Sequence, residues 1–242
     1  MKGRNPLVVG FYTVPEAARL IRVGSARRIY GWLKGYPGRN VGPLLTRDFE
    51  PVDGYEELSF LDLMEVRFVE HFREYGVKVG SLRRAAEELK AEFKTDHPFA
   101  LSKVLLAADK ADVFVVETLR KAAKAEGDPR LRSLTTRNYV MYEAIKQSLV
   151  PGIEFDATSH LAKQWRPMPD RFPEIVVDPL RAFGRPIIAK GIPTETLRDA
   201  WRVEGRKADP VAEAFGITAK EVLEAVNFEQ ALDEPIPNVV AA

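Results

Sequence analysis

The side chains best suited to chemistry in this sequence are cations, and nine of them lie in the first 47 residues beside a single acid, Glu16. The remaining residues carry 27 Lys or Arg against 34 Asp or Glu, and the whole chain has a net charge of only +1. Basic side chains gathered on one small module are typical of a surface that binds a polyanion. We therefore expect a nucleic acid partner at this end, the alternative being a solvated basic surface without a partner.

Sequence motifs of catalysis are absent. The sequence has no Walker loop, no Gly-x-Gly-x-x-Gly, no His-Glu-x-x-His and no spacing typical of a Ser/His/Asp triad. His71, His97 and His160 lie far apart, no acid is placed by a motif for a metal ion, and the absence of Cys excludes disulfide bonds and Cys-based zinc sites. We expect a protein that is not an enzyme and uses no cofactor or metal, although motifs do not detect a cluster that forms only on folding.

Two short helices are predicted to position the N-terminal cations. Thr13 and Glu16 have the spacing of a capping box at the start of the first helix. Gly24 can take the left-handed conformation common at a helix C-terminus, and Ser25 can cap the second helix. This spacing predicts a helix-turn-helix between Tyr12 and Lys34, in which the second helix reads DNA.

A Gly- and Pro-rich stretch over residues 35–54 follows the reader helix and is predicted to form a wing, with Leu44–Arg47 as one strand of a small hairpin. Side chains at the start of the reader helix and on the wing are placed to contact bases or phosphates. The predicted DNA-contacting residues are Thr13, Arg22, Ser25, Arg27, Arg28, Tyr30, Lys34, Arg39 and Arg47.

Two long helices are predicted next, because apolar residues recur every three to four positions over 58–75 and from Ser81 to Phe93. Ser59 and Asp62 are predicted to cap the first of them, and Ser81 the second. Their aromatic stripes are interpreted as core.

The middle of the chain is predicted to mix strands with a Pro-rich connector. Two β-rich runs predict a hairpin over residues 102–118, and periodic apolar residues predict a helix over 137–149. Seven prolines between residues 151 and 193 indicate an extended connector. Short strands are predicted within it at 153–156, 174–178 and 186–188.

Three helices are predicted in the C-terminal segment, with N-caps at Thr194, Asp209 and Thr218, the last in a capping box with Glu221. The second and third of these helices form another helix-turn-helix pattern. Between Thr194 and Glu234 the chain has ten acids and five Lys or Arg. Because DNA would repel an acidic face, we expect this unit to contact protein instead.

The first 95 residues or so resemble the DNA-binding domain of the MerR family. The resemblance rests on the order of capped helix, Arg-bearing helix and Pro/Gly wing, followed by Leu58-Ser59-Phe60-Leu61-Asp62-Leu63, Tyr75-Gly76-Val77 and Leu82-Arg83-Arg84-Ala85. It implies a winged helix-turn-helix that binds double-stranded DNA as a dimer. The long dimerising coiled coil that usually follows in that family is not found in this sequence.

Residues from about Phe172 to Ala231 resemble a bacterial family of short antitoxin domains that pair with PIN-like ribonuclease toxins, as in VapBC modules. The resemblance rests on Ile175-Val176-Val177-Asp178-Pro179, Gly184-Arg185-Pro186-Ile187-Ile188 and Val211-Ala212-Glu213-Ala214-Phe215-Gly216-Ile217. Arg185 stands where the family usually has a second Gly. The resemblance implies toxin neutralisation, dimerisation and operator binding. The residues we assign to the partner interface are Arg185, Ile187, Ile188, Trp201, Phe215, Val222 and Val226.

Together these features predict an α+β protein that is mainly α. The predicted domains are a MerR-like winged helix-turn-helix over residues 1–95, a central α/β region with the connector over 96–171, and an antitoxin-like three-helix domain over 172–242. A cut near Leu149 should therefore separate DNA binding from toxin binding.

The predicted function is that of a cytoplasmic, homodimeric VapB-type antitoxin that binds its own operator and a PIN-like ribonuclease toxin, without contact to a membrane. The alternative is an effector-responsive MerR-like transcriptional regulator whose central region holds a small ligand. An enzyme, such as a nuclease, is the third hypothesis.

Overall fold

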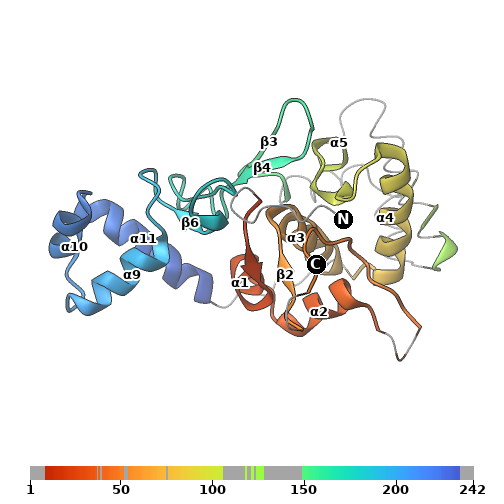
Figure 1. Ribbon diagram of the computed structural model, residues 1–242, viewed down its shortest axis with the longest axis horizontal. Coiled ribbons are helices and arrows are strands. Elements are labelled where there is room, and N and C mark those ends of the chain that lie inside the picture. Colours follow the sequence, from red (N-terminus) through yellow and green to blue (C-terminus); the bar gives the residue numbers. More distant parts are fainter. Residues whose placement is uncertain are drawn as a thin grey trace.

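The protein has an elongated α+β fold, with a unit of three helices at one end and helix α4 at the other (Figure 1). The computed structural model describes residues 9–36, 38, 40–51, 54–74, 76–105, 118, 121–122, 124–127 and 149–234. Over these residues, no helix combines the length and apolarity that crossing a lipid bilayer requires.

The elements follow one another as short strands, paired helices, a small sheet and a final helical unit. In chain order they are β1 (Tyr12–Thr13), α1 (Val14–Leu20), α2 (Ala26–Lys34), β2 (Glu57–Leu58), α3 (Phe60–Glu74), α4 (Val79–Phe93), η3 (Pro98–Ala100), α5 (Ser102–Leu105), β3 (Ile153–Phe155), β4 (Ala162–Trp165), β5 (Val176–Val177), η4 (Ala182–Gly184), β6 (Pro186–Ile187), α9 (Thr194–Val203), α10 (Ala208–Phe215) and α11 (Ala219–Asp233).

The two predicted N-terminal helices are confirmed. Thr13 caps α1 in a capping box, because its hydroxyl accepts from the Glu16 amide at 3.3 Å and its amide donates to the Glu16 carboxylate at 2.8 Å. Ser25 is the N-cap of α2, but its side chain makes no capping hydrogen bond. The left-handed residue at the turn is Arg22, with φ of 57°, and not Gly24 as predicted.

Helix α3 lies at the centre of the fold. It is capped by Ser59 as predicted: the Ser59 amide donates to Asp62 Oδ2 at 2.8 Å, and the Asp62 amide donates to Ser59 Oγ at 3.1 Å. The predicted cap at Ser81 is wrong, because α4 begins two residues earlier, after Lys78, and the Ser81 side chain is buried inside the helix.

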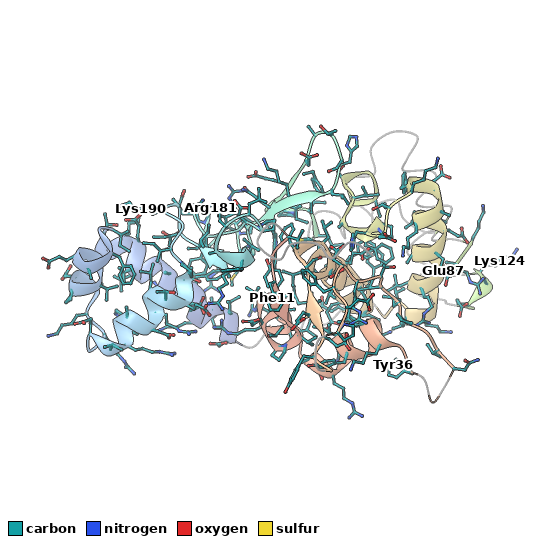
Figure 2. The ribbon with its side chains drawn as sticks, viewed as in Figure 1. Phe11, Tyr36, Glu87, Lys124, Arg181 and Lys190 are labelled. Carbon is teal, nitrogen blue, oxygen red and sulfur yellow. The ribbon has the colours of Figure 1, made fainter. Side chains whose placement is uncertain are left out.

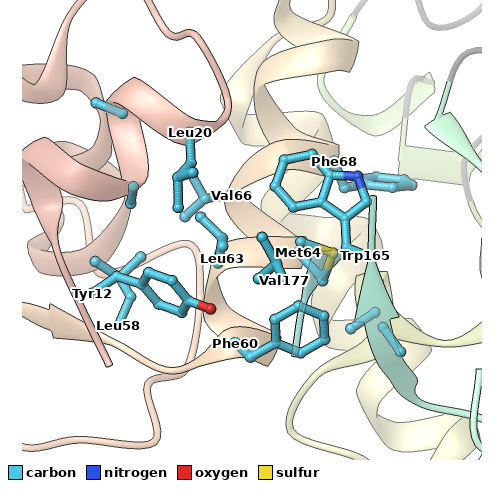
Figure 3. Close-up of a cluster of buried hydrophobic side chains, with 14 of the residues drawn as sticks. Tyr12, Leu20, Leu58, Phe60, Leu63, Met64, Val66, Phe68, Trp165 and Val177 are labelled. Carbon is cyan, nitrogen blue, oxygen red and sulfur yellow. The ribbon is translucent and has the colours of Figure 1, made fainter. Parts of the chain in front are cut away.

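One hydrophobic core joins both halves of the chain around α3. Figure 3 shows the α3 side chains Leu63, Met64, Val66 and Phe68 in one cluster with buried side chains from both halves of the chain. Tyr12, Leu20 and Leu58 come from β1, α1 and β2, and Trp165 and Val177 come from β4 and β5. The small sheet therefore shares its core with the helix-turn-helix and is not an independent layer.

The predicted wing strand at Leu44–Arg47 is wrong. Leu44 and Leu45 are buried, and the Leu44 amide donates to the Trp32 carbonyl at 2.8 Å, which ties this segment to the end of α2. The wing-like pairing occurs earlier, where Tyr36 and Val41 exchange backbone hydrogen bonds of 2.6 and 3.2 Å. A small hairpin still follows α2, but it is shorter than predicted.

The predicted hairpin at 102–118 is wrong at its start, where Ser102–Leu105 forms a short helix, α5. Residues 106–117 lie outside the described residues. The predicted helix at 137–149 also lies outside them, apart from Leu149, which is buried.

The Pro-rich segment is a sheet and not an extended connector. Its four antiparallel strands are ordered β3-β4-β5-β6, and Trp165 pairs with Ile153 on one side and Val177 on the other. The three predicted short strands are present as β3, β5 and β6, and β4 was not predicted. Pro186 is tolerated because β6 is at the edge of the sheet, where a missing amide need not break the ladder.

The C-terminal unit consists of α9, α10 and α11, as predicted. The capping box of α11 is confirmed, with the Glu221 amide 3.2 Å from the Thr218 hydroxyl. The other two predicted caps are displaced by one or two residues, because Pro193 precedes α9 and Lys207 precedes α10. Thr194 is the first residue of α9 and is buried. Figure 2 shows Lys190 beside this unit and Glu87 on α4, toward opposite ends of the molecule.

Candidate nucleic-acid interface and its link to the C-terminal helices

Helix α2 turns its apolar side inward and its cations outward. Ile29, Trp32 and Leu33 are buried, whereas Arg27 and Arg28 are exposed. Within the described part of the chain, Arg27 makes no hydrogen bond or ion pair. This side chain is therefore the cation of α2 most available to an external partner.

Two buried carboxylates orient the other cations of this surface. Arg28 Nη1 lies 2.8 Å from Glu70 Oε1 of α3, and Lys34 Nζ lies 2.9 Å from Glu56 Oε1. Arg47 is also paired with Glu56. The acids hold the cations in place but neutralise part of their charge, so the surface is less positive than the sequence count implies.

The remaining predicted DNA-contacting residues have mixed positions. The Thr13 side chain is occupied by the capping box of α1, and Ser25 lies at the start of α2. Tyr30 is half-buried, with the Lys34 ammonium 5.9 Å from the centre of its ring. Arg22 Nη2 donates to the Glu234 carbonyl at 2.9 Å, which directs it toward the C-terminal helices. Arg39 lies outside the described residues.

Helix α1 is attached directly to α11 through Arg19. Its Nε lies 2.7 Å from Asp233 Oδ1, its Nη1 lies 2.8 Å from Glu229 Oε2, and its Nη2 donates to the Glu229 carbonyl at 2.9 Å. Hydrogen bonding to Asp233 raises the pKa of Arg19 and holds the pKa of Asp233 below its usual range. The contact fixes the acidic C-terminal unit against the first helix of the helix-turn-helix.

Glu229 is the centre of this contact. It is buried, with 2% of its side chain exposed, and it also accepts from Arg198 Nη1 at 3.0 Å and from the Thr194 hydroxyl. Sequence reasoning counted Glu229 as one of the acids that repel DNA. The only local signal of its role was its position among the apolar residues of α11, because its partner Arg19 lies 210 residues away.

The partner residues predicted from the sequence are mostly inside the fold. Ile187, Ile188, Val222 and Val226 are buried in the core, where their apolar side chains pack against the protein itself. Arg185 is exposed and paired with Glu195, Trp201 is half-buried, and the Phe215 side chain is 37% exposed.

Other apolar side chains of the C-terminal helices are exposed and were not predicted. Val203 is 83% exposed at the end of α9, and Leu223 is 43% exposed on α11. Together with Phe215 these residues give the acidic unit apolar surface, which is what a protein partner would bury.

A buried cluster of ionisable side chains was missed altogether. His97 lies 3.1 Å from Asp48, 3.6 Å from Asp62 and 3.3 Å from Glu65. Burial would lower the pKa of His97, but the carboxylates of Asp48 and Glu65 outweigh it and raise the pKa to about 10. Burial raises the pKa of Asp62 to about 7, against the opposing effects of His97 and the Ser59 amide. No local spacing predicts this cluster, because its members come from three separate elements.

Comparison with known proteins gives distant similarity over nearly the whole chain. A Mycobacterium tuberculosis protein named "Putative antitoxin VapB45" is 26% identical over 230 residues, covering 90% of this chain and 93% of that protein. A second protein of that organism, "Uncharacterized protein Rv2308", is 24% identical over 237 residues, covering 90% of this chain and 89% of that protein. No protein-family model matches the chain.

The fold is also similar to one solved experimentally. The crystal structure of Rv2018 from Mycobacterium tuberculosis has a TM-score of 0.66 and 21% sequence identity, and the similarity covers 93% of this chain and 99% of that one. The arrangement of helix-turn-helix, small sheet and helical unit is therefore a fold that occurs in another chain of similar extent.

Proposed function

We propose that this protein is the DNA-binding antitoxin of a toxin–antitoxin module, which neutralises a PIN-like ribonuclease and represses its own operon as a homodimer. The observation that carries the proposal is the similarity to a protein named as an antitoxin over 90% of this chain and 93% of that relative. The similarity covers 90% of this chain, so it is not limited to one of its parts.

The DNA-binding part of the proposal is supported by the surface of α2. Arg27 and Arg28 are exposed near the N-terminus of this helix, where a reader helix contacts base edges. Lys34 is exposed near its other end. A homodimer would double these contacts and place two reader helices on successive half-sites.

The toxin-binding part is supported by the C-terminal unit. Its acids would repel a nucleic acid but suit a basic protein surface, such as the RNA-binding groove of a ribonuclease. Phe215 and Leu223 supply exposed apolar area beside those acids. We assign toxin binding to this unit, with Trp201 and Arg185 next to it.

The decisive experiment is co-expression with the neighbouring reading frame. If that frame encodes a small PIN-like protein, the two proteins should co-purify, and cells that express it should survive only when this chain is present. A gel shift should show that the chain binds its own promoter. Survival without this chain, or separate elution of the two proteins, would refute the antitoxin function.

An effector-responsive regulator is the second candidate, because a cavity of about 220 Å³ lies between α3 and the small sheet. Phe60, Leu61, Leu161 and Leu180 line its apolar part. For this function, promoter binding would change with a small molecule and would not depend on a toxin. If the co-purified toxin alters promoter binding and small-molecule extracts leave it unchanged, the result favours the antitoxin function.

A further inference from the structure

Three side chains that could bind a metal ion lie close together in the interior, each from a separate segment of the chain. Asp48 belongs to the segment that follows the hairpin of the reader helix, Asp62 lies in the first turn of α3, and His97 immediately precedes η3. One ligand atom from each lies within 4.8 Å of the others. His97 and Asp62 are almost completely buried, with 2% and 0% exposure.

Asp62 directs one carboxylate oxygen into this cluster without a hydrogen-bond donor. Its Oδ2 accepts from the Ser59 amide at 2.8 Å and from the Asp48 amide at 3.3 Å. Its Oδ1 has no hydrogen-bond partner among the described residues, although the side chain is wholly buried. A buried carboxylate oxygen without a hydrogen bond is costly unless a cation lies close to it. The nearest cationic group is the His97 ring, whose Nδ1 lies 3.6 Å from Oδ1.

Glu65 orients the imidazole of His97, as carboxylates do for the ligating histidines of metal sites. Glu65 Oε2 lies 3.3 Å from Nδ1, and Glu65 Oε1 accepts from the Phe99 amide at 3.1 Å. With Nδ1–H donated to Glu65, Nε2 is the nitrogen that can bind a metal ion once the ion displaces its proton. Nε2 lies 3.1 Å from Asp48 Oδ1. A carboxylate that accepts from the far nitrogen of a ligating histidine is the usual outer partner in metal sites.

We propose that Asp48, Asp62 and His97 bind one divalent transition-metal ion, with Glu65 as the outer carboxylate. Two carboxylate oxygens and one imidazole nitrogen suit Zn²⁺ or Mn²⁺ better than Ca²⁺, which prefers oxygen ligands throughout. The 3.1 Å between Nε2 and Asp48 Oδ1 is near the roughly 3.3 Å that separates ligands on a tetrahedral ion with bonds of about 2.0–2.1 Å.

The cavity beside α3 borders this site at Asp48. Asp48 lines that cavity, together with Asp156, Ser159 and Lys163 at its polar side. Water or a small anionic ligand entering there can complete the coordination of the ion. Bound metal would also fasten the segment that carries Arg47 to α3, next to the reader helix.

The test is metal binding by the full-length protein after treatment with a chelator. Isothermal titration with Zn²⁺ and with Mn²⁺ should show one saturable site per chain for at least one of them, and Ca²⁺ should show none. At a hundredfold excess over the dissociation constant, the melting temperature should rise by about 5–10 °C. No saturable binding of Zn²⁺ or Mn²⁺ would overturn the proposal.

Variants locate the site. Asp62→Asn and His97→Gln should abolish binding, and Glu65→Gln should weaken it by about 10–100-fold through loss of the outer hydrogen bond. His71→Gln is the matched control, because it removes a histidine from α3, the helix that carries Asp62 and Glu65. This variant should bind the metal ion as the wild type does. Wild-type affinity in folded His97→Gln or Glu65→Gln would overturn the proposal, even if Asp62→Asn failed to fold.

Discussion

The guanidinium of Arg19 in α1 and the carboxylate of Glu229 in α11 lie 2.8 Å apart, across 210 residues of sequence. Since α1 is the first helix of the helix-turn-helix, the proposed DNA-binding and toxin-binding parts are in direct contact. A partner that moves α11 would therefore act on α1 as well, and the two proposed activities need not be independent.

Breaking this contact should destabilise the fold. Glu229→Gln leaves the cations of Arg19 and Arg198 without their shared buried carboxylate, so we expect a loss of about 2–4 kcal/mol in the free energy of unfolding. A double-mutant cycle with Arg19→Ala, measured by urea unfolding, should give a coupling energy in the upper part of the range of about 0.5–3 kcal/mol that residues in contact show. The exposed pair Arg171–Glu234 is the control, with a coupling under about 1 kcal/mol. Equal couplings for the two pairs would contradict the central role of Glu229.

Removal of the reader-helix arginines should weaken binding to promoter DNA. Arg27→Ala and Arg28→Ala should each cost about 1–3 kcal/mol, and the double variant about 2–5 kcal/mol. Arg28→Ala also leaves Glu70 as an unpaired acid near the DNA. Arg202→Ala removes the same charge from α9 and should leave binding unchanged. Fluorescence anisotropy measures the affinity of each variant for promoter DNA. If the double variant is folded and binds normally, DNA recognition belongs to another surface.

Binding to DNA should depend steeply on salt. If Arg27, Arg28 and Lys34 of both protomers contact phosphates, about six counterions are displaced, and log K should fall against log salt with a slope of about −5. The full range expected for five to eight contacts is about −4 to −7. Titrations between 50 and 300 mM salt measure the slope, and a flat response would rule out the proposed DNA contacts.

Of two truncated fragments, one ending at Leu149 and one ending at Pro193, only the second should fold. A fragment that ends at Leu149 loses the sheet that covers α3, so side chains such as Met64 and Phe68 would be exposed and the fragment should aggregate. A fragment that ends at Pro193 keeps the sheet and should bind promoter DNA but not the toxin. For both fragments, gel filtration measures aggregation, a gel shift measures DNA binding and a pull-down measures toxin binding. Toxin capture by the Pro193 fragment would assign the partner site to the sheet.

Protonation of His71 should destabilise the protein in mild acid. Burial, with a contribution from the charge of Arg67, lowers the pKa of His71 to about 4. Between pH 6.5 and 4 the unfolded chain therefore binds a proton that the folded chain does not, and stability falls as the pH falls. The loss at pH 5 should be about 2 kcal/mol relative to pH 7. Urea unfolding of His71→Gln at both pH values should show a pH-dependent loss smaller by that amount, and an identical loss would show that His71 does not contribute.

Local features of this fold follow from the sequence because a few neighbouring residues decide them. The capping boxes of Thr13 with Glu16 and of Thr218 with Glu221 are complete within four residues, and both are present. The apolar period of α3 and the short strand at β5 are local in the same way. Errors of one or two residues at Thr194 and Asp209 arose where a neighbouring residue could begin the helix equally well.

Only the tertiary structure decided which residues meet. The pairing of Arg19 with Glu229, the burial of Ile187 and Val226, and the cluster around His97 all join segments that are distant in the chain. The Pro-rich segment became a sheet because α3 offered it an apolar face, against which Trp165 and Val177 could be buried. The sequence alone determined where helices could begin and where positive charge would gather. Packing around α3 determined which of those charges remained exposed to a partner. The other cations became paired with buried carboxylates such as Glu56, Glu70 and Glu229.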